Sequence, residues 1–133
     1  MKKIIKYPLL VILLVFFFAA CKKKQVTLTT AEKIQGTWQL QIEIYHQYVG
    51  GVNYSDTTLG NGATIEFRSD SKAYSDFQGQ KDTSVYTLTG DTQITLNGTD
   101  TYDIKTLTSN QFVLYSKQTQ GADYYEGTIT LIK

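Results

Sequence analysis

The sequence predicts an all-β domain, a small antiparallel up-and-down barrel of about eight strands preceded by a short helical turn. The first observation is the segment from Gly36 to Ile44, in which apolar and polar residues alternate without a break, as in a strand with one dry face. The second is the later rhythm of short alternating segments separated by turn residues. The third is that the single proline, Pro8, precedes all of these segments, so that no proline interrupts a strand.

Residues 1–20 have the composition of a signal peptide and not of the folded domain. Three lysines near the N-terminus precede an unbroken apolar run from Leu9 to Phe18, which is short for a membrane span. We therefore divide the chain into a signal peptide at 1–20, a tether at 21–28 and the barrel domain at 29–133.

The end of the apolar run, Phe18-Ala19-Ala20-Cys21, resembles the lipobox of bacterial lipoproteins. The resemblance implies cleavage before Cys21, a lipid such as palmitate on this residue, and a lipid-anchored location in the cell envelope, at the outer membrane. Cys21 is the only cysteine, so the domain forms no internal disulfide. The alternatives are an ordinary secretory signal with a chance cysteine and an uncleaved anchor helix. Lys22 to Lys24 are either a solvated tether or a contact with anionic head groups.

The elements follow in order. Thr29 and Glu32 have the spacing of a capping box, and Gly36 suits the end of the short helical turn that they begin. The tryptophan-led strand is expected to run to about Tyr45, and residues 46–62 are expected to form a long irregular connection, part of it pairing as a short strand. The strands after Gly62 are predicted at 63–68, 73–77, 84–88, 93–96, 101–105, 111–115 and 124–132, with a hairpin turn at Asn97-Gly98.

Short connections and the need to remove exposed strand edges favour a closed barrel over a sandwich. An eight-stranded barrel is either packed solid or holds one small molecule. The expected inward-facing residues are bulky: Trp38, Leu40, Ile42, Ile44, Ile65, Phe67, Phe77, Tyr86, Leu88, Ile94, Leu96, Tyr102, Ile104, Phe112, Leu114, Ile129 and Leu131.

The capped turn, the Gly36-Thr37-Trp38 sequence at the head of the first strand and the strands that end at Lys133 together resemble the lipocalin-like domains of bacterial lipoproteins. The resemblance covers about Thr29 to the C-terminus. It implies a barrel whose tryptophan packs at the closed end beneath a basic side chain from the last strand, the role for which Lys133 is the candidate.

The residues that could support chemistry predict no catalytic site, no cofactor and no metal site. After removal of the signal peptide, the chain has 10 basic and 12 acidic residues, and this net charge of −2 does not suit nucleic-acid binding. His46 is the only histidine, and a metal site would need further ligands. Nucleophilic catalysis would require a serine beside His46 and an acid to orient it, and the chain has no Gly-x-Ser-x-Gly elbow.

The one excess in the composition is tyrosine, with ten copies. Tyr45, Tyr48 and Tyr54 cluster with His46 and are the candidate ligand-binding residues, because tyrosine combines a rigid apolar ring with a polar tip. One hypothesis is capture of a small hydrophobic or amphipathic molecule at the open end of the barrel. The alternative is a filled barrel that contacts a protein partner in the envelope through its outer tyrosines. A cavity larger than about 300 Å³ would favour the first, and a solid interior with an exposed tyrosine patch the second.

Overall fold

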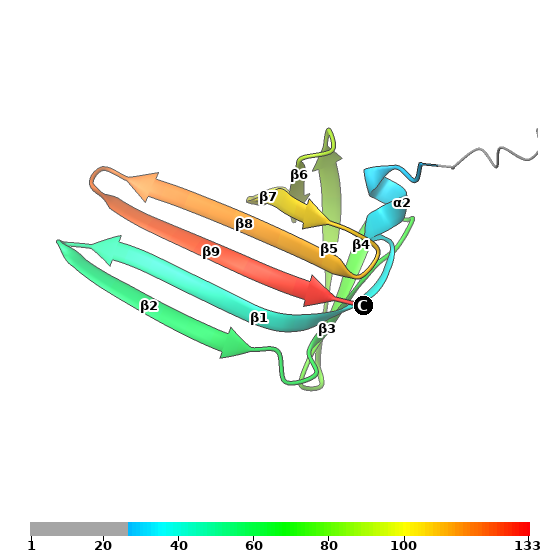
Figure 1. Ribbon diagram of the computed structural model, residues 1–133, viewed down its shortest axis with the longest axis horizontal. Coiled ribbons are helices and arrows are strands. Elements are labelled where there is room, and N and C mark those ends of the chain that lie inside the picture. The colour runs from blue at the N-terminus through cyan, green and yellow to red at the C-terminus, as the bar shows by residue number, and fades with distance from the viewer. Residues whose placement is uncertain (1–26) are drawn as a thin grey trace, which may run out of the picture.

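The computed structural model describes residues 27–133; the predicted signal peptide, Cys21 and most of the tether lie outside these residues. No helix in the described part is long and apolar enough to cross a membrane. One short helix and nine strands follow one another along the chain (Figure 1). Their bounds are α2 Thr30–Ile34, β1 Gly36–Val49, β2 Val52–Leu59, β3 Thr64–Phe67, β4 Lys72–Phe77, β5 Gln80–Thr89, β6 Gln93–Leu96, β7 Asp100–Leu107, β8 Gln111–Gln120 and β9 Asp123–Ile132.

The strands form a closed antiparallel barrel, as the sequence predicts. Neighbours pair in the order β1-β3-β4-β5-β6-β7-β8-β9, and β9 pairs back onto β1 from Gln39↔Ile132 to Tyr48↔Tyr124. These eight strands close the wall, and β2 is a ninth strand attached to β1 alone. The predicted hairpin at Asn97-Gly98 is also confirmed, because both residues have the positive φ angles, 51° and 74°, that such a turn requires.

One end of the barrel is closed by α2 and an aromatic layer. The predicted capping box is present, since Thr29 and Glu32 exchange hydrogen bonds across the first turn. Ile34 and Trp38 are fully buried, and the Trp38 Nε1–H donates to the Ile34 carbonyl at 2.7 Å. The ring centres of Trp38 and Phe112 are 5.4 Å apart. Ile34, Trp38 and Phe112 thus form one buried cluster that joins α2, β1 and β8.

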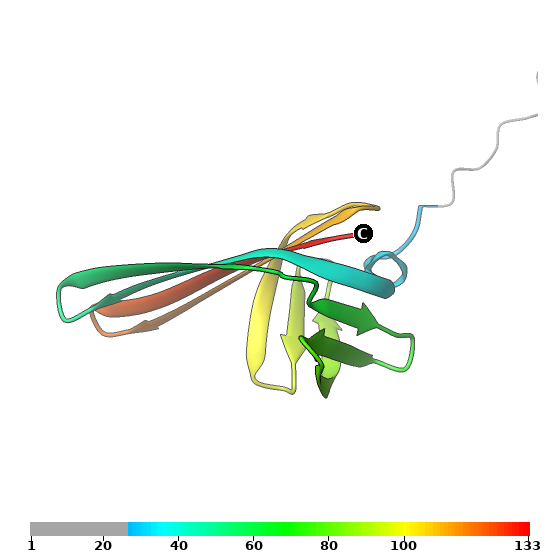
Figure 2. The same ribbon diagram turned by 90° about the horizontal axis from the view of Figure 1, so that it is seen from below.

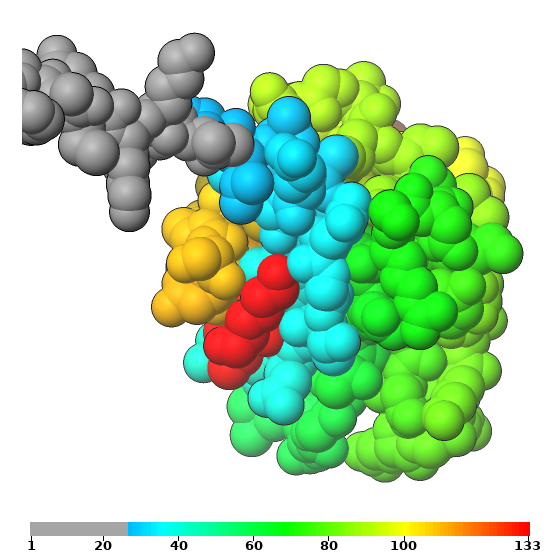
Figure 3. All heavy atoms as spheres, turned by 90° about the vertical axis from the view of Figure 1, so that its right-hand side faces the viewer, coloured from blue at the N-terminus to red at the C-terminus, as the bar shows by residue number. Residues whose placement is uncertain are grey.

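Lys133 covers this closed end from outside. Its Nζ lies 4.3 Å from the centre of the Trp38 ring and donates to the carbonyl of Gln35 at 2.8 Å. In the space-filling view of this end, the C-terminal residues lie beside the start of β1 (Figure 3). A Cβ on Gly36 would lie 3.5 Å from the Lys133 Nζ, an ordinary contact, so it is the φ angle of 105° that favours glycine at this position. A cation over an indole face contributes about 0.5–2 kcal/mol, depending on its exposure.

The expectation of a mostly irregular connection over residues 46–62 is wrong, although part of it does pair as a strand, as expected. β1 continues to Val49, turns through Gly50 and Gly51, and returns as β2 in register from Val49↔Val52 to Ile42↔Leu59. Both glycines have positive φ angles, which fits a two-residue hairpin turn. The long hairpin extends β1 well beyond the barrel rim.

The second half of β1, β2, β9 and β8 form a projecting sheet that extends beyond the barrel, in the order β2-β1-β9-β8 (Figures 1 and 2). β8 pairs with β7 only from Phe112 to Tyr115, so its remaining residues to Gln120 form one edge of this sheet. β2 forms the other edge, and all eight of its residues are exposed. The face of the sheet that continues the barrel interior is called the inner face below, and the opposite one the outer face.

A β-bulge at Gln41 changes which residues of β1 face inward. Leu40 pairs with Leu131, but the next pair is Ile42 with Thr130, so that Gln41 has no partner of its own on β9. Leu131 and Ile129 face the interior, which places Leu40 and Glu43 inward with them. The expectation that Ile42 and Ile44 face inward is therefore wrong: both lie on the outer face, and Glu43 and Tyr45 take the inner one.

The chain crosses close to this bulge after β2. The Gly60 N–H donates to the Gln41 carbonyl at 3.1 Å, the Leu40 N–H to the Ala63 carbonyl at 2.9 Å, and the Ala63 N–H to the Gly60 carbonyl at 2.8 Å. A Cβ on Gly60 would lie 1.6 Å from the Leu40 carbonyl oxygen. Only glycine fits this contact, which joins the projecting hairpin to the barrel.

Candidate functional site

A cavity of about 280 Å³ opens at the barrel mouth, above the aromatic layer. Phe67, which packs edge-on against Tyr86 and Phe112, forms its floor. Its walls are aliphatic and come from strands all around the barrel: Leu40, Ile65, Ile94, Leu96, Leu114, Ile129 and Leu131. Its polar groups are few and lie on different strands: Glu43, Thr64, Ser75, Asp82, Ser84 and Tyr102. Apolar walls with a few converging polar groups are typical of small-molecule sites.

The cavity continues onto the projecting sheet. A second hollow of about 400 Å³ lies on the inner face and shares Glu43, Tyr102 and Ile129 with the cavity. Its other lining residues are Tyr45, Ser116, Gln118, Tyr125, Glu126 and Gly127. An elongated molecule with one end in the barrel could therefore also contact the second hollow, which contains two further tyrosines, Tyr45 and Tyr125.

Tyr102 stands where the two hollows meet. Burial, reinforced by the negative charges of Asp100 and Glu43, raises the pKa of its phenol above the ordinary value of 10.0. The hydroxyl therefore stays protonated at neutral pH and remains able to donate a hydrogen bond into the site. Of these two carboxylates, Glu43 lines both hollows.

The structure separates the four residues that the sequence groups as a ligand site. Tyr45 lies on the inner face and lines the second hollow. Tyr54 pairs beside Gln47 near the tip of the hairpin, on the same face but outside the lining of either hollow, and its side chain is about half exposed. His46 and Tyr48 alternate with Tyr45 and therefore lie on the outer face, where Tyr48 stacks on Tyr124 at 5.7 Å.

The neighbours of His46 bear on the question of catalysis. The register places Ser55 of β2 on one side of His46 and Glu126 of β9 on the other. No hydrogen bond joins the three side chains in the described structure, and the Glu126 carboxylate instead accepts from Tyr115 at 2.9 Å and pairs with Lys117 at 3.3 Å. These two contacts, led by the Tyr115 hydroxyl, lower the pKa of Glu126. The arrangement lies on an open sheet face and lacks the linked hydrogen bonds on which nucleophilic catalysis depends.

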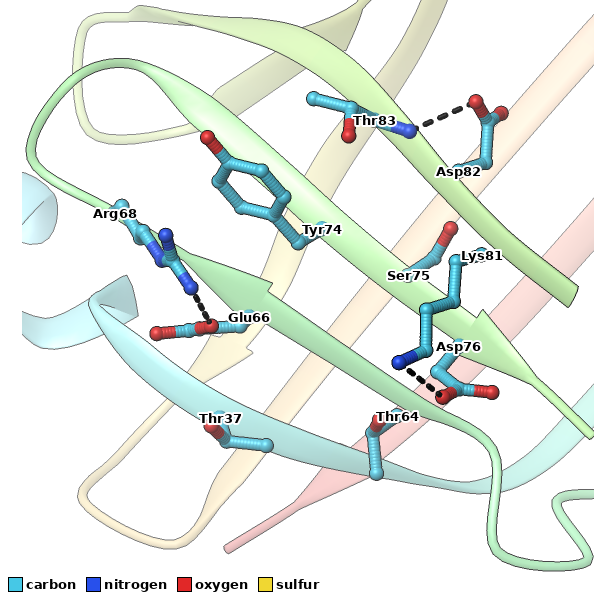
Figure 4. Close-up of a pocket in the computed structure, with 10 residues that line it drawn as sticks. All are labelled: Thr37, Thr64, Glu66, Arg68, Tyr74, Ser75, Asp76, Lys81, Asp82 and Thr83. Atoms are coloured by element: carbon cyan, nitrogen blue, oxygen red, sulfur yellow. Dashed lines mark hydrogen bonds and ion pairs between the residues drawn. The ribbon is translucent and has the colours of Figure 1, made fainter. Parts of the chain in front are cut away.

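A larger hollow, of about 690 Å³, lies on the outside of the barrel over β3, β4 and β5 (Figure 4). Its charged side chains are paired with one another, except for Asp82, which also lines the cavity at the mouth. Arg68 bonds to Glu66 at 2.7 Å and stacks over Tyr74 at 4.2 Å, and Lys81 lies 4.0 Å from Asp76. The hydrogen bond from Arg68 lowers the pKa of Glu66. Because this groove is broad and polar and both of its basic side chains are already paired with carboxylates, we favour the mouth as the site despite its smaller volume.

Several residues of the mouth are absent from the sequence-based site. Glu43 occupies a position whose face depends on the bulge, so the alternation pattern alone misplaces it. Tyr125 shares a face with Ile129 and Leu131 on β9, so the alternation of the last strand could have identified it. Asp82 falls in what the sequence presents as a turn, whereas it belongs to β5 and lines the cavity. The alternation pattern does predict that Tyr102 faces the interior.

In the described residues, no group of three or more histidine, cysteine, aspartate or glutamate side chains is arranged to hold a metal ion. Comparison with curated proteins and with solved structures finds no match. The family model described as a lipocalin-like domain matches residues 34–114, from the end of α2 to the middle of β8. This range is more than half of the chain and includes the tryptophan-led strand and most of the barrel wall. The fold is typically that of a binding domain, and the chain belongs to the lipocalin-like domain family.

Proposed function

We propose that this protein is a lipid-anchored envelope lipoprotein whose barrel binds one small hydrophobic or amphipathic molecule at its mouth and performs no catalysis. The observation that carries the proposal is the cavity of about 280 Å³, with aliphatic walls and a closed aromatic floor. At about 280 Å³ the cavity lies just below the roughly 300 Å³ at which ligand pockets generally begin, so it suits a small molecule or one end of a longer one that continues into the second hollow.

The second hollow supports an amphipathic ligand. It begins at Tyr102 and Ile129, where the cavity ends, and its lining is more polar than that of the cavity. A molecule with an apolar end in the barrel and a polar part on the inner face of the projecting sheet would match this change in chemistry. The filled barrel on which the alternative function depends, a pure protein-contact module, fits less well with a cavity at the mouth.

Native mass spectrometry of the envelope-purified protein tests the binding function. The expected result is a mass in excess of the lipidated chain that disappears when the protein is denatured. A matched pair of variants assigns the site: Ser75→Leu places an apolar side chain toward the cavity, and Thr83→Leu makes a similar change on the outside of the barrel. Ser75→Leu should abolish the excess mass and Thr83→Leu should retain it. A protein that never carries or takes up a small molecule would contradict the proposal.

The anchor is tested separately. The membrane partner is proposed through lipid on Cys21, followed by Lys22 to Lys24 as the start of the tether. Cys21→Ser should release the protein from the membrane pellet on fractionation, because the acyl chains provide most of the attachment. Unchanged sedimentation with membranes would contradict lipidation while leaving the barrel site unaffected.

A further inference from the structure

The charged groups that line the mouth are all acidic. They are Glu43 and Asp82 in the cavity and Glu43 in the second hollow; Glu126 borders the second hollow, but its carboxylate turns to Tyr115 and Lys117 on the outer face. No lysine, arginine or histidine lines either hollow. An apolar cavity by itself selects for size and hydrophobicity, whereas unbalanced charge at its rim also selects for the sign of a ligand's charge.

Neither Glu43 nor Asp82 has a basic partner within 4.0 Å in the described structure. Asp82 accepts one hydrogen bond from the Thr83 backbone at 2.7 Å, and neighbouring Lys81 turns to Asp76 on the other face. Glu43 forms no ion pair with any described residue.

The position of these charges matters as much as their number. Glu43 belongs to β1 and Asp82 to β5, so they approach the cavity from different parts of the wall. Between the two hollows, Tyr102 feels the charge of Glu43 as well as that of Asp100. Its ring offers an aromatic face to a cation, and its neutral hydroxyl offers a hydrogen bond.

We infer that the ligand is an amphipathic molecule that carries a cationic group, such as a protonated amine, held near Glu43 and Tyr102 with its apolar part in the barrel. This inference rests on the proposed binding function and specifies the class of ligand. Fatty acids and other anionic amphiphiles are disfavoured, because their head group would meet carboxylates and no basic side chain. The bulge at Gln41 makes this selectivity possible, since it turns Glu43 inward.

Three probes with the same apolar chain test the inference: hexylamine, hexanol and hexanoate, titrated at pH 7 and low ionic strength. The full-length protein is used in a nonionic detergent, with protein-free micelles as the blank, and affinities are measured by isothermal titration calorimetry. Hexylamine should bind about tenfold more tightly than hexanol, and hexanoate more weakly than both. The advantage of the amine should shrink as salt screens the exposed carboxylates.

Glu43→Gln removes one charge while keeping the shape of the side chain. It should weaken hexylamine about fivefold and leave hexanol unchanged, an effect of the size expected for one partly exposed charge pair. Glu66→Gln is the matched control, because that carboxylate is paired with Arg68 in the outer groove. It should alter none of the three affinities.

The outcomes separate this inference from the proposed function. If hexanoate binds as tightly as hexylamine, or if Glu43→Gln leaves the preference for the amine intact, the cationic ligand class is wrong while the cavity remains a binding site. If none of the three probes binds and Ser75→Leu changes nothing, the binding function itself is refuted.

Discussion

Replacement of Gly60 by alanine should be among the most damaging single changes in this domain. The new Cβ would lie 1.6 Å from the Leu40 carbonyl oxygen and 2.4 Å from the carbonyl carbon, and both are backbone atoms that cannot rotate away. Relief of the overlap requires a separation of at least 3.0 Å, a displacement of 1.4 Å at the crossing of the two chains. φ at Gly60 lies outside the left-handed range, so the effect is purely steric.

The magnitude follows from the hydrogen bonds at the crossing. A displacement of this size would lengthen the three backbone bonds that join Gly60, Ala63, Leu40 and Gln41, now 2.8 to 3.1 Å, beyond bonding distance. At about 1 kcal/mol of net stability for each bond, the loss is about 3 kcal/mol. That is a large fraction of the roughly 5–15 kcal/mol that stabilises a typical domain.

Gly127→Ala is the matched control, since Gly127 also lies outside the left-handed φ range. Its Cβ would meet the Ser116 hydroxyl at 3.6 Å and the Ile44 carbonyl at 3.9 Å, which are ordinary contacts. The free energy of unfolding should change by less than about 1 kcal/mol. Urea unfolding followed by fluorescence of Trp38, the only tryptophan and fully buried, measures both variants. A Gly60→Ala variant within about 1 kcal/mol of the parent would refute the close crossing of the chains.

Two further changes test the closed end and the outer face. Lys133→Met keeps the apolar stem of the side chain but removes the ammonium group over Trp38 and its hydrogen bond to Gln35. The free energy of unfolding in urea should fall by about 1–2 kcal/mol, and the Trp38 emission maximum should shift. An unchanged emission spectrum would place the ammonium group elsewhere. Tyr115→Phe should raise the pKa of Glu126 back toward 4.5, as measured by NMR of its carboxyl carbon, because the phenol hydroxyl is the main cause of the lowered value. Since a lowered pKa in the folded state contributes stability above pH 4.5 that is lost as the pH falls below it, the parent should lose more stability than the Tyr115→Phe variant on acidification, and equal losses would contradict the bond.

The parts of the fold that follow from local pattern were predictable from the sequence. The alternation that begins at Trp38, the capping box at Thr29 and the turn at Asn97-Gly98 each have a signal within a few residues, and each is present in the structure. The hairpin at Gly50-Gly51 had such a signal too, but the polar residues of β2 hide it, because this strand is exposed on both faces and lacks an apolar alternation.

The site was much less predictable, for a physical reason. The series Trp38, Leu40, Ile42, Ile44 continues without a break, although the bulge separates its first two members from its last two. Nothing at Gln41 in the sequence marks an extra residue, since a bulge depends on how the partner strand pairs. The pattern therefore assigns Glu43 to the outer face and the two isoleucines to the inner face, the reverse of the arrangement at the mouth.

The bulge also constrains how the chemistry of the mouth can change. Along β1, odd positions after residue 41 belong to the pocket and even positions to the opposite surface, so each set can be altered without disturbing the other. Deleting Gln41 would not exchange the two sets, because Ile42 would keep Thr130 and Glu43 would keep Ile129 as its partner on β9. An exchange would require β1 to slip by one residue against β9 along the whole projecting sheet, so the acidic entrance is altered by substitution at residues 43 and 45 and is insensitive to loss of the extra residue.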